Sequence, residues 1–402
     1  MKMLWFIIMI LAAVTLASCR YGSNFSFSGD GEDGITTVNI NDETGYLKIK
    51  AQGKITFSDD ELDVKSISPG GYISFKRNGT KIRVNNNSAG ELVYEINGSG
   101  QKTGLNANDK KLLAKAIKEM INVGFDAKGR AERIYIKGGA TAVMNAADDI
   151  RNDYVKSIYF DYLLTAPTLS VNEMTQMARK IGMTVNSDYE KSNLLKKFPA
   201  SYLENDQTAS AYLDAINTIG SDFEKANAAK SIADQQLTQQ QYGEVLNITN
   251  TINSDFEKAN VLKQLIHHGL PEEGNLISFL TVTDNVNSDF EKANVLKDLL
   301  DQGVPPGQSF NKFLNVTSNV SSDFERANIL KKLALKNIAG EDQWISLIIE
   351  TEKVSSENER SGALVEIAKK MPVNDRVKTA YLASAKTITS DYEYGQAVKA
   401  VR

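Results

Sequence analysis

A five-residue motif recurs along the C-terminal part of this chain at a nearly constant interval. The first clear copy is Ser-Asp-Tyr-Glu-Lys from Ser187, four close copies follow, and weaker copies begin at Ser356 and Ser390. An earlier relative begins at Asn152, and successive copies start 33 to 35 residues apart. A fixed period in this range indicates stacked supersecondary units, which bury their apolar faces only against one another.

Each copy has the composition of a helix N-terminus. A glutamate follows the serine by three residues, which is the pattern of a capping box, in which each side chain bonds to the other residue's backbone amide. The aspartate between them adds negative charge at the positive end of the helix dipole. We expect the repeated Asp, Glu and Lys to form caps and a solvated face. The predicted caps are Ser187, Glu190, Ser221, Glu224, Ser254, Glu257, Ser288, Glu291, Ser322, Glu325, Ser356, Glu359, Ser390 and Glu393.

An asparagine also recurs, four residues after the aromatic residue of the motif. These amides could form an interaction face, or they could bridge neighbouring repeats and satisfy turn carbonyls. We favour the structural interpretation, because buried polar groups are normally hydrogen-bonded. The predicted structural ladder consists of Asn193, Asn227, Asn260, Asn294 and Asn328.

The apolar pattern of one copy predicts two helices. The first is expected over 255–268 with a stop at Gly269, and the second over about 275–283. We therefore expect a mainly α fold, in which residues 125–402 form an α-α solenoid of about eight 34-residue helix–turn–helix repeats. The predicted apolar positions are Phe256, Ala259, Leu262, Leu265 and Ile266 in the first helix and Leu276, Phe279 and Leu280 in the second.

Residues 35–124 have a different sequence pattern from the helical repeats. Short alternating segments separated by turn residues predict a small antiparallel β-meander, and Asn78-Gly79 is a strong hairpin signal. An amphipathic helix is expected over 109–122, with Asn108 as its cap and Gly124 as its stop. The strands are expected at 35–40, 46–49, 54–57, 72–75, 81–84 and 91–96.

The amino terminus has the pattern of a bacterial lipoprotein precursor. A charged start and an apolar run from Leu4 to Leu16 resemble a secretory signal over residues 1–18. Leu-Ala-Ser before Cys19 resembles the lipobox, so Cys19 is the predicted lipid anchor and 19–34 the tether. An ordinary signal with an incidental cysteine is the alternative. Arg20 follows Cys19, and by resemblance the absence of aspartate there favours the outer membrane, facing the periplasm.

The sequence contains few residues of the types that most often act in catalysis. Cys19 is the only cysteine, and His267 and His268 are the only histidines. We therefore expect no enzyme, no cofactor and no metal, although Asp59, Asp60, Glu61 and Asp63 leave weak calcium binding open beside the favoured interpretation as a solvated acidic loop. Removal of the signal takes Lys2 with it and leaves a net charge of −5, which argues against a nucleic-acid partner.

The whole layout resembles uncharacterised bacterial lipoproteins that combine a small N-terminal β module with Ser-Asp-Tyr/Phe-Glu helical repeats of the HEAT or tetratricopeptide kind. The tetratricopeptide signature itself is absent. The resemblance implies no established activity, but some relatives occur beside membrane metallopeptidases of the β-lactam-sensor type.

Three functions follow as hypotheses. The leading one is a lipid-anchored, non-catalytic interaction or scaffold protein, whose repeat surface binds an unknown protein or peptide of the envelope. The second, which rests on the resemblance, is an accessory or sensor of a membrane peptidase or an envelope stress system. The third is a glycan hydrolase that uses two carboxylates.

Overall fold

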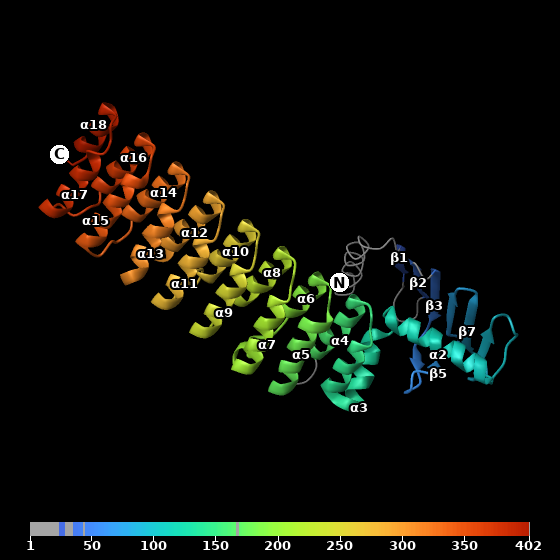
Figure 1. Cartoon of the computed structure of the whole chain (residues 1–402). Coiled ribbons are helices and arrows are strands. Elements are labelled where there is room, and N and C mark those ends of the chain that lie inside the picture. The colour runs from blue at the N-terminus through green and yellow to red at the C-terminus, as the bar shows by residue number, and fades with distance from the viewer. Residues whose placement is uncertain (1–23, 29–34, 43–44, 166–168, 402) are drawn as a thin grey trace. The chain divides into compact units, whose positions relative to one another are not determined.

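The computed structural model describes residues 24–28, 35–42, 45–165 and 169–401. The chain divides into two compact units, the first formed by 1–130 with 150–155 and the second by 131–149 with 156–402. The first unit contains the described strands, and the second contains the stacked helices (Figure 1). The predicted fold class, mainly α with an N-terminal antiparallel sheet and a following helical repeat, is confirmed.

The first unit is built on an antiparallel six-stranded sheet in the order β1-β2-β3-β6-β7-β8. The short hairpin β4–β5 forms a separate two-stranded sheet. Asn78 and Gly79 both have positive φ and join β6 to β7, as the hairpin signal predicts. The strands are β1 (Asn24–Ser28), β2 (Ile35–Asp42), β3 (Gly45–Gln52), β4 (Ile55–Phe57), β5 (Val64–Ile67), β6 (Tyr72–Arg77), β7 (Thr80–Asn86) and β8 (Leu92–Ile96).

Two strands of this unit were not expected from the sequence. Residues 24–28, which lie within the predicted tether, form β1 and pair with β2 in antiparallel register. Residues 64–67 form β5. Helix α2 (Ala107–Asn122) begins at the N-cap Asn106, whose side chain accepts from two backbone amides, rather than at Asn108. Figure 1 shows α2 beside the sheet. Arg77 of β6 forms an ion pair with Glu119 of α2 at 3.3 Å.

The second unit is a row of helix pairs. Helices α3 (Ala127–Asp148) and α4 (Asp153–Thr165) begin in residues of the first unit and continue into this one. The first layer consists of α5 (Val171–Thr184), α7 (Asp206–Asn217), α9 (Gln239–Asn250), α11 (Glu273–Asp284), α13 (Gly307–Ser318), α15 (Glu341–Glu350) and α17 (Asp375–Ala385). The second layer, called here the capped layer, consists of α6 (Asp188–Leu195), α8 (Asp222–Ala233), α10 (Asp255–Leu265), α12 (Asp289–Gln302), α14 (Asp323–Ala334), α16 (Glu357–Ala368) and α18 (Asp391–Lys399). Short 3-10 turns lie at Ala200–Leu203 and Thr351–Lys353.

Each helix of either layer packs against the next helix of the same layer and against its partner in the other layer (Figure 1). The core therefore runs between the layers, and Leu262, Leu276, Phe279 and Leu280 are completely buried in it, as predicted. Burial of a side chain of this kind contributes about 1.5–3 kcal/mol relative to exposure. The prediction is wrong for Phe256, which is 56% exposed.

Candidate functional site

Each of the seven serines is the N-cap of a helix in the capped layer. The serine hydroxyl accepts from the backbone N–H of the glutamate three residues on, at 3.3–3.4 Å. From Ser221 to Ser390, however, the expected return bond from the glutamate is not formed. The serine N–H instead donates to a carboxylate of the preceding repeat. A full capping box forms elsewhere, at Ser170 and Glu173.

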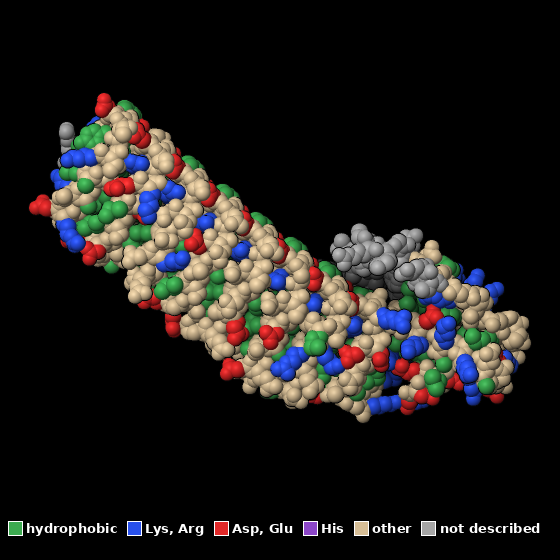
Figure 2. All heavy atoms as spheres, viewed as in Figure 1, with side chains coloured by type: hydrophobic (Ala, Val, Ile, Leu, Met, Phe, Trp, Pro, Cys, Tyr) green, Lys and Arg blue, Asp and Glu red, His purple; other side chains and the backbone are tan. Residues whose placement is uncertain are grey.

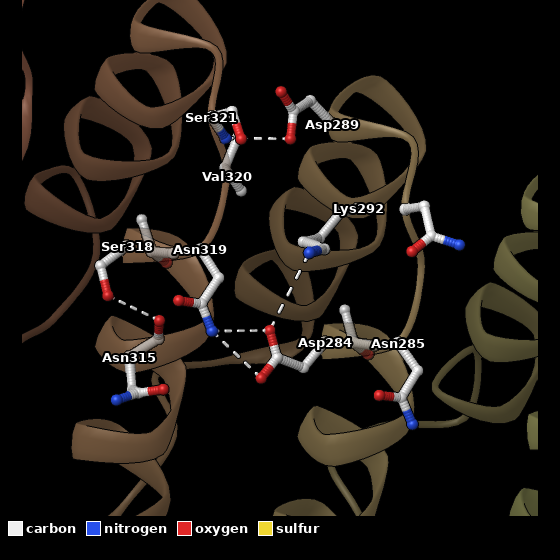
Figure 3. A network of polar contacts seen from close by, with 12 residues as sticks. Asp284, Asn285, Asp289, Lys292, Asn315, Ser318, Asn319, Val320 and Ser321 are labelled. Atoms are coloured by element: carbon white, nitrogen blue, oxygen red, sulfur yellow. Dashed lines mark hydrogen bonds and ion pairs between the residues drawn. The ribbon is translucent and has the colours of Figure 1, made fainter.

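That carboxylate belongs to the residue directly after the cap, and it binds two successive amides of the next repeat. Asp289 Oδ1 accepts from Ser321 N at 2.9 Å, and its Oδ2 accepts from Ser322 N at 2.8 Å. Figure 3 shows Asp289 reaching the turn that leads into the neighbouring helix. Charge-assisted bonds of this kind are stronger than neutral ones. The aspartate therefore joins consecutive repeats, a role beyond the dipole interaction expected from the sequence. The other carboxylates with this pair of bonds are Asp188, Asp222, Asp255, Asp323 and Glu357.

The lysine of the motif is buried, so the expectation of a solvated face is wrong for it. Lys258 is only 6% exposed, and its Nζ donates to the backbone oxygen of Asn285, the C-cap of the following helix α11, at 3.2 Å. Helix C-termini carry partial negative charge, which favours a cation there. Burial lowers the pKa of Lys225, against the opposing effects of Asp222 and Asp188. Arg326 replaces the lysine in α14 and donates to three backbone carbonyls.

The five asparagines of the predicted ladder do not form one. Asn193, Asn227, Asn260, Asn294 and Asn328 are half-buried on the capped layer. Their side chains make no hydrogen bond to one another or to a turn carbonyl within residues 169–401. The structural interpretation favoured from the sequence therefore lacks the bonds it requires.

Amide bridges between repeats occur instead at the C-terminal ends of the first-layer helices. Asn285 Nδ2 donates to Asn250 Oδ1 at 2.9 Å. One repeat later, Asn319 Nδ2 donates to both oxygens of Asp284, at 2.9 and 3.2 Å (Figure 3). The sequence signal for these bridges is an Asn at the C-terminal end of α9 or at the C-cap of α11 and α13. The helices α5, α15 and α17 lack this Asn, so it is not a constant part of the repeated motif.

The aromatic residue of the motif lies on the outer surface of the capped layer. The exposed fractions are 57% for Phe223, 56% for Phe256, and 58% for Phe290 and Phe324. Tyr189 and Tyr392 are exposed at the same position of α6 and α18, and Asn358 replaces the aromatic in α16. Figure 2 shows hydrophobic groups recurring along one edge of the helical array beside acidic groups. We call the row Phe223, Phe256, Phe290 and Phe324 the aromatic row.

A polar pocket of 490 Å³ lies further along the same outer surface, between α8, α10 and α12. Its lining includes Asn260, Lys263, His267, Asp298 and Asp301. Hydrogen bonds from Lys332 and Lys336 lower the pKa of Asp301. A general acid for glycoside hydrolysis needs the opposite shift, so Asp301 is unsuited to that role. Burial raises the pKa of Glu350, which lies on α15 and does not line this pocket.

The candidate calcium ligands have protein partners of their own. Asp60 accepts from Ser58 Oγ and Leu62 N, Glu61 forms an ion pair with Arg130, and Asp63 accepts from the hydroxyl of Tyr94. Among the described residues, no group of three or more His, Cys, Asp or Glu side chains is arranged to hold a metal ion.

The predicted lipid anchor Cys19 lies outside the described residues. In the part of the chain that the structure describes, no helix combines the length and the apolar character needed to cross a membrane.

Three comparisons were made with known proteins, covering family models, curated proteins and solved structures. No family model matches this chain, and neither a curated protein nor a solved structure matches it.

Proposed function

We propose that this chain is a non-catalytic interaction protein that binds a protein or peptide partner through the outer surface of the capped layer. The observation that carries the proposal is the aromatic row, which keeps phenylalanine in four successive copies although each ring is more than half exposed. The exposed position eleven residues later is not kept, since it is occupied by Asp234, His267, Asp301 and Leu335. Exposure at this position of the array therefore goes together with variation, whereas the exposed phenylalanine is retained.

The recurrent polar residues of the motif have such a constraint, because the serine, the aspartate and the lysine all bond within or between repeats. The aromatic row has no comparable structural role, since exposure forgoes the stabilisation that burial of an aromatic ring would give. Exposed aromatic side chains are enriched where proteins bind one another. A binding surface explains both the exposure and the repetition.

The experiment that tests this proposal is crosslinking in intact cells, followed by recovery of the chain with its partners. The wild type is compared with the double variant Phe256→Ala/Phe290→Ala. The matched control is Leu335→Ala, because Leu335 is also an exposed apolar residue, 57% exposed, on the same surface. We expect a reproducible partner that the double variant loses and the control keeps. A partner set that the double variant leaves unchanged contradicts the proposal.

We also propose that Cys19 carries a lipid and holds the chain at the outer membrane, facing the periplasm. The support is the signal-like run before Leu16-Ala17-Ser18-Cys19 and the arginine that follows. Anchoring would raise the effective concentration of the aromatic row near membrane partners. The test is cell fractionation of Cys19→Ser, which we expect to leave the membrane fraction. A variant that still sediments with membranes contradicts the anchor and leaves the binding proposal unaffected.

A further inference from the structure

The aromatic row is bordered by carboxylates. In sequence, each phenylalanine stands between the aspartate that holds the next repeat and the glutamate that follows the cap by three residues. Glu224, Glu257 and Glu291 form no ion pair within residues 169–401, and Glu257 Oε2 is buried without a hydrogen-bond partner. The glutamates of the next two repeats differ, since Glu325 and Glu359 pair with Lys297 and Lys331.

Among the described residues, no cation forms an ion pair with Glu224, Glu257 or Glu291 to offset this charge. The lysines two residues after the rings are Lys225, Lys258 and Lys292, which are 6–8% exposed. Lys225 donates to Thr251 and Lys258 to Asn285, and Lys292 lies 3.9 Å from Asp284 of α11. The turn residues before the caps, such as Asn253 and Asn287, are uncharged. Lys230 and Lys263 occupy the same position of the motif as Lys297 and Lys331, but within residues 169–401 they form no ion pair with Glu257 or Glu291. The edge that carries the aromatic row therefore has an acidic border.

We propose that this edge binds an extended cationic peptide segment, with a lysine or arginine at every third residue. The inference rests on the proposed function and names the partner chemistry for the same surface. A cationic side chain placed over each ring gains a cation–π interaction, and the adjacent glutamate supplies the opposite charge. The complementarity is strongest at Phe223, Phe256 and Phe290, where that glutamate has no cation of its own.

The asparagines assigned from sequence to a structural ladder supply the second element of this site. Asn227, Asn260 and Asn294 lie four residues after the rings, so each is a neighbour of its ring on the helix surface. A side-chain amide has both donors and acceptors, which match the C=O and N–H of an extended peptide backbone. Within residues 169–401 their side-chain amides form no hydrogen bond.

The spacing of the row favours a three-residue period in the peptide. Packed helices lie about 8–10 Å apart, and three residues of a polyproline II segment span about 9 Å. Side chains at every third position of such a segment lie on one side and meet successive rings. A segment of this kind also loses little conformational freedom when it binds, because it is extended beforehand.

The test is fluorescence anisotropy with the full chain in detergent and three labelled peptides. The first repeats Lys-Pro-Pro four times, the second has the same composition with the lysines grouped at one end, and the third repeats Glu-Pro-Pro. We expect the first peptide to bind, with an affinity that falls as salt rises. The shuffled peptide should bind about tenfold more weakly, and the acidic peptide should not bind. Equal binding of the first two overturns the three-residue period, and binding of the acidic peptide overturns the charge assignment.

Site-directed variants test whether the peptide binds at the aromatic row. Phe256→Ala/Phe290→Ala and Glu257→Gln/Glu291→Gln should each weaken binding of the Lys-Pro-Pro peptide about tenfold. Leu335→Ala should leave it unchanged, and circular dichroism checks that each variant stays folded. Loss of binding in the control, or none in the phenylalanine variant, overturns the inference. A chito-oligosaccharide that binds through the same rings while the cationic peptide does not also overturns it.

The two proposals fail differently. A partner recovered from cells that depends on Phe256 and Phe290, together with no binding of the cationic peptide, rejects this inference and keeps the proposed function. Binding of the cationic peptide, together with no partner in cells that depends on these rings, keeps the peptide-binding inference and rejects the proposed function.

Discussion

Asp289 Oδ2 accepts a hydrogen bond from the backbone N–H of Ser322 at 2.8 Å, across the boundary between two repeats. The bond satisfies an N-cap amide that a capping glutamate would otherwise bind, and its equivalent recurs from Asp188 to Glu357. Because a buried amide without a partner costs free energy, each capped-layer helix from α8 to α18 depends on the preceding repeat for a complete cap. The repeats are therefore coupled through polar bonds as well as apolar packing.

Removal of this bond should destabilise the array. Asp289→Ala leaves the amides of Ser321 and Ser322 without their acceptor, so we expect the free energy of unfolding to fall by about 1–3 kcal/mol. Chemical denaturation measures the change, and hydrogen exchange should show faster exchange at those two amides. Asp298→Ala on the same helix is the control, since Asp298 makes no hydrogen bond or ion pair within residues 169–401. Equal stability of the two variants would contradict the role of Asp289.

The buried lysines should also contribute to stability. Lys258→Met removes the donor to Asn285 O and the positive charge at the C-terminal end of α11, and we expect a loss of about 1–2 kcal/mol. Lys263→Met is the matched control, because Lys263 lies on the same helix, is only half-buried and forms no ion pair within the described helices. Thermal and urea unfolding compare the two. A Lys258→Met variant as stable as the control would show that apolar packing replaces the bond.

The recurrent asparagines should contribute little to stability. Asn294→Ala breaks no hydrogen bond within the described repeats, so the change in unfolding free energy should stay within about 0.5 kcal/mol. The sequence-based ladder would require a clear fall in melting temperature instead. The positive control is Asn285→Ala, which removes the bridge to Asn250 and leaves its buried neighbours Val286 and Thr283 in place. Differential scanning calorimetry of both variants distinguishes the two expectations.

Tyr242, whose hydroxyl is buried, should make stability depend on alkaline pH. Desolvation raises the pKa of Tyr242 above its ordinary value of 10.0, and its hydroxyl has no hydrogen-bond partner among the described residues. The un-ionised Tyr242 hydroxyl therefore leaves the free energy of unfolding unchanged below about pH 10. Stability is lost as pH rises further, because the tyrosine of the unfolded chain ionises first. Tyr242→Phe should be at least as stable as wild type near neutral pH and lose less stability above about pH 10.

Tyr381→Phe is the comparison for that variant. The Tyr381 hydroxyl donates to Ala397 O at 2.9 Å, so its removal should cost about 1 kcal/mol at neutral pH. Denaturant titrations of both variants on either side of about pH 10 provide the measurement. A neutral-pH loss in Tyr242→Phe that equals the loss in Tyr381→Phe would contradict the assignment of an unpartnered hydroxyl.

The sequence identified the positions of many residues of the candidate site, but it did not identify their structural roles. The spacing of Ser254 and Glu257 correctly placed an N-cap, because the bond from a serine hydroxyl to the third amide is local. The predicted bond from the Ser254 amide to the Glu257 side chain is wrong, because that amide donates to Asp222, 32 residues earlier. Phe256 was expected inside, because a 3.6-residue period gives its angle on the helix but not the distance to the nearest neighbour.

The sequence by itself determined the repeat, the starts of the serine-capped helices and the hairpin at Asn78-Gly79. These depend on residues a few positions apart, whose geometry is set by backbone conformation and local hydrogen bonds. Only the tertiary structure decided which groups bond between repeats. It buried Lys258, left the Asn260 amide without a hydrogen bond to residues 169–401 and exposed Phe256, because these outcomes depend on which atoms of a neighbouring helix lie within reach.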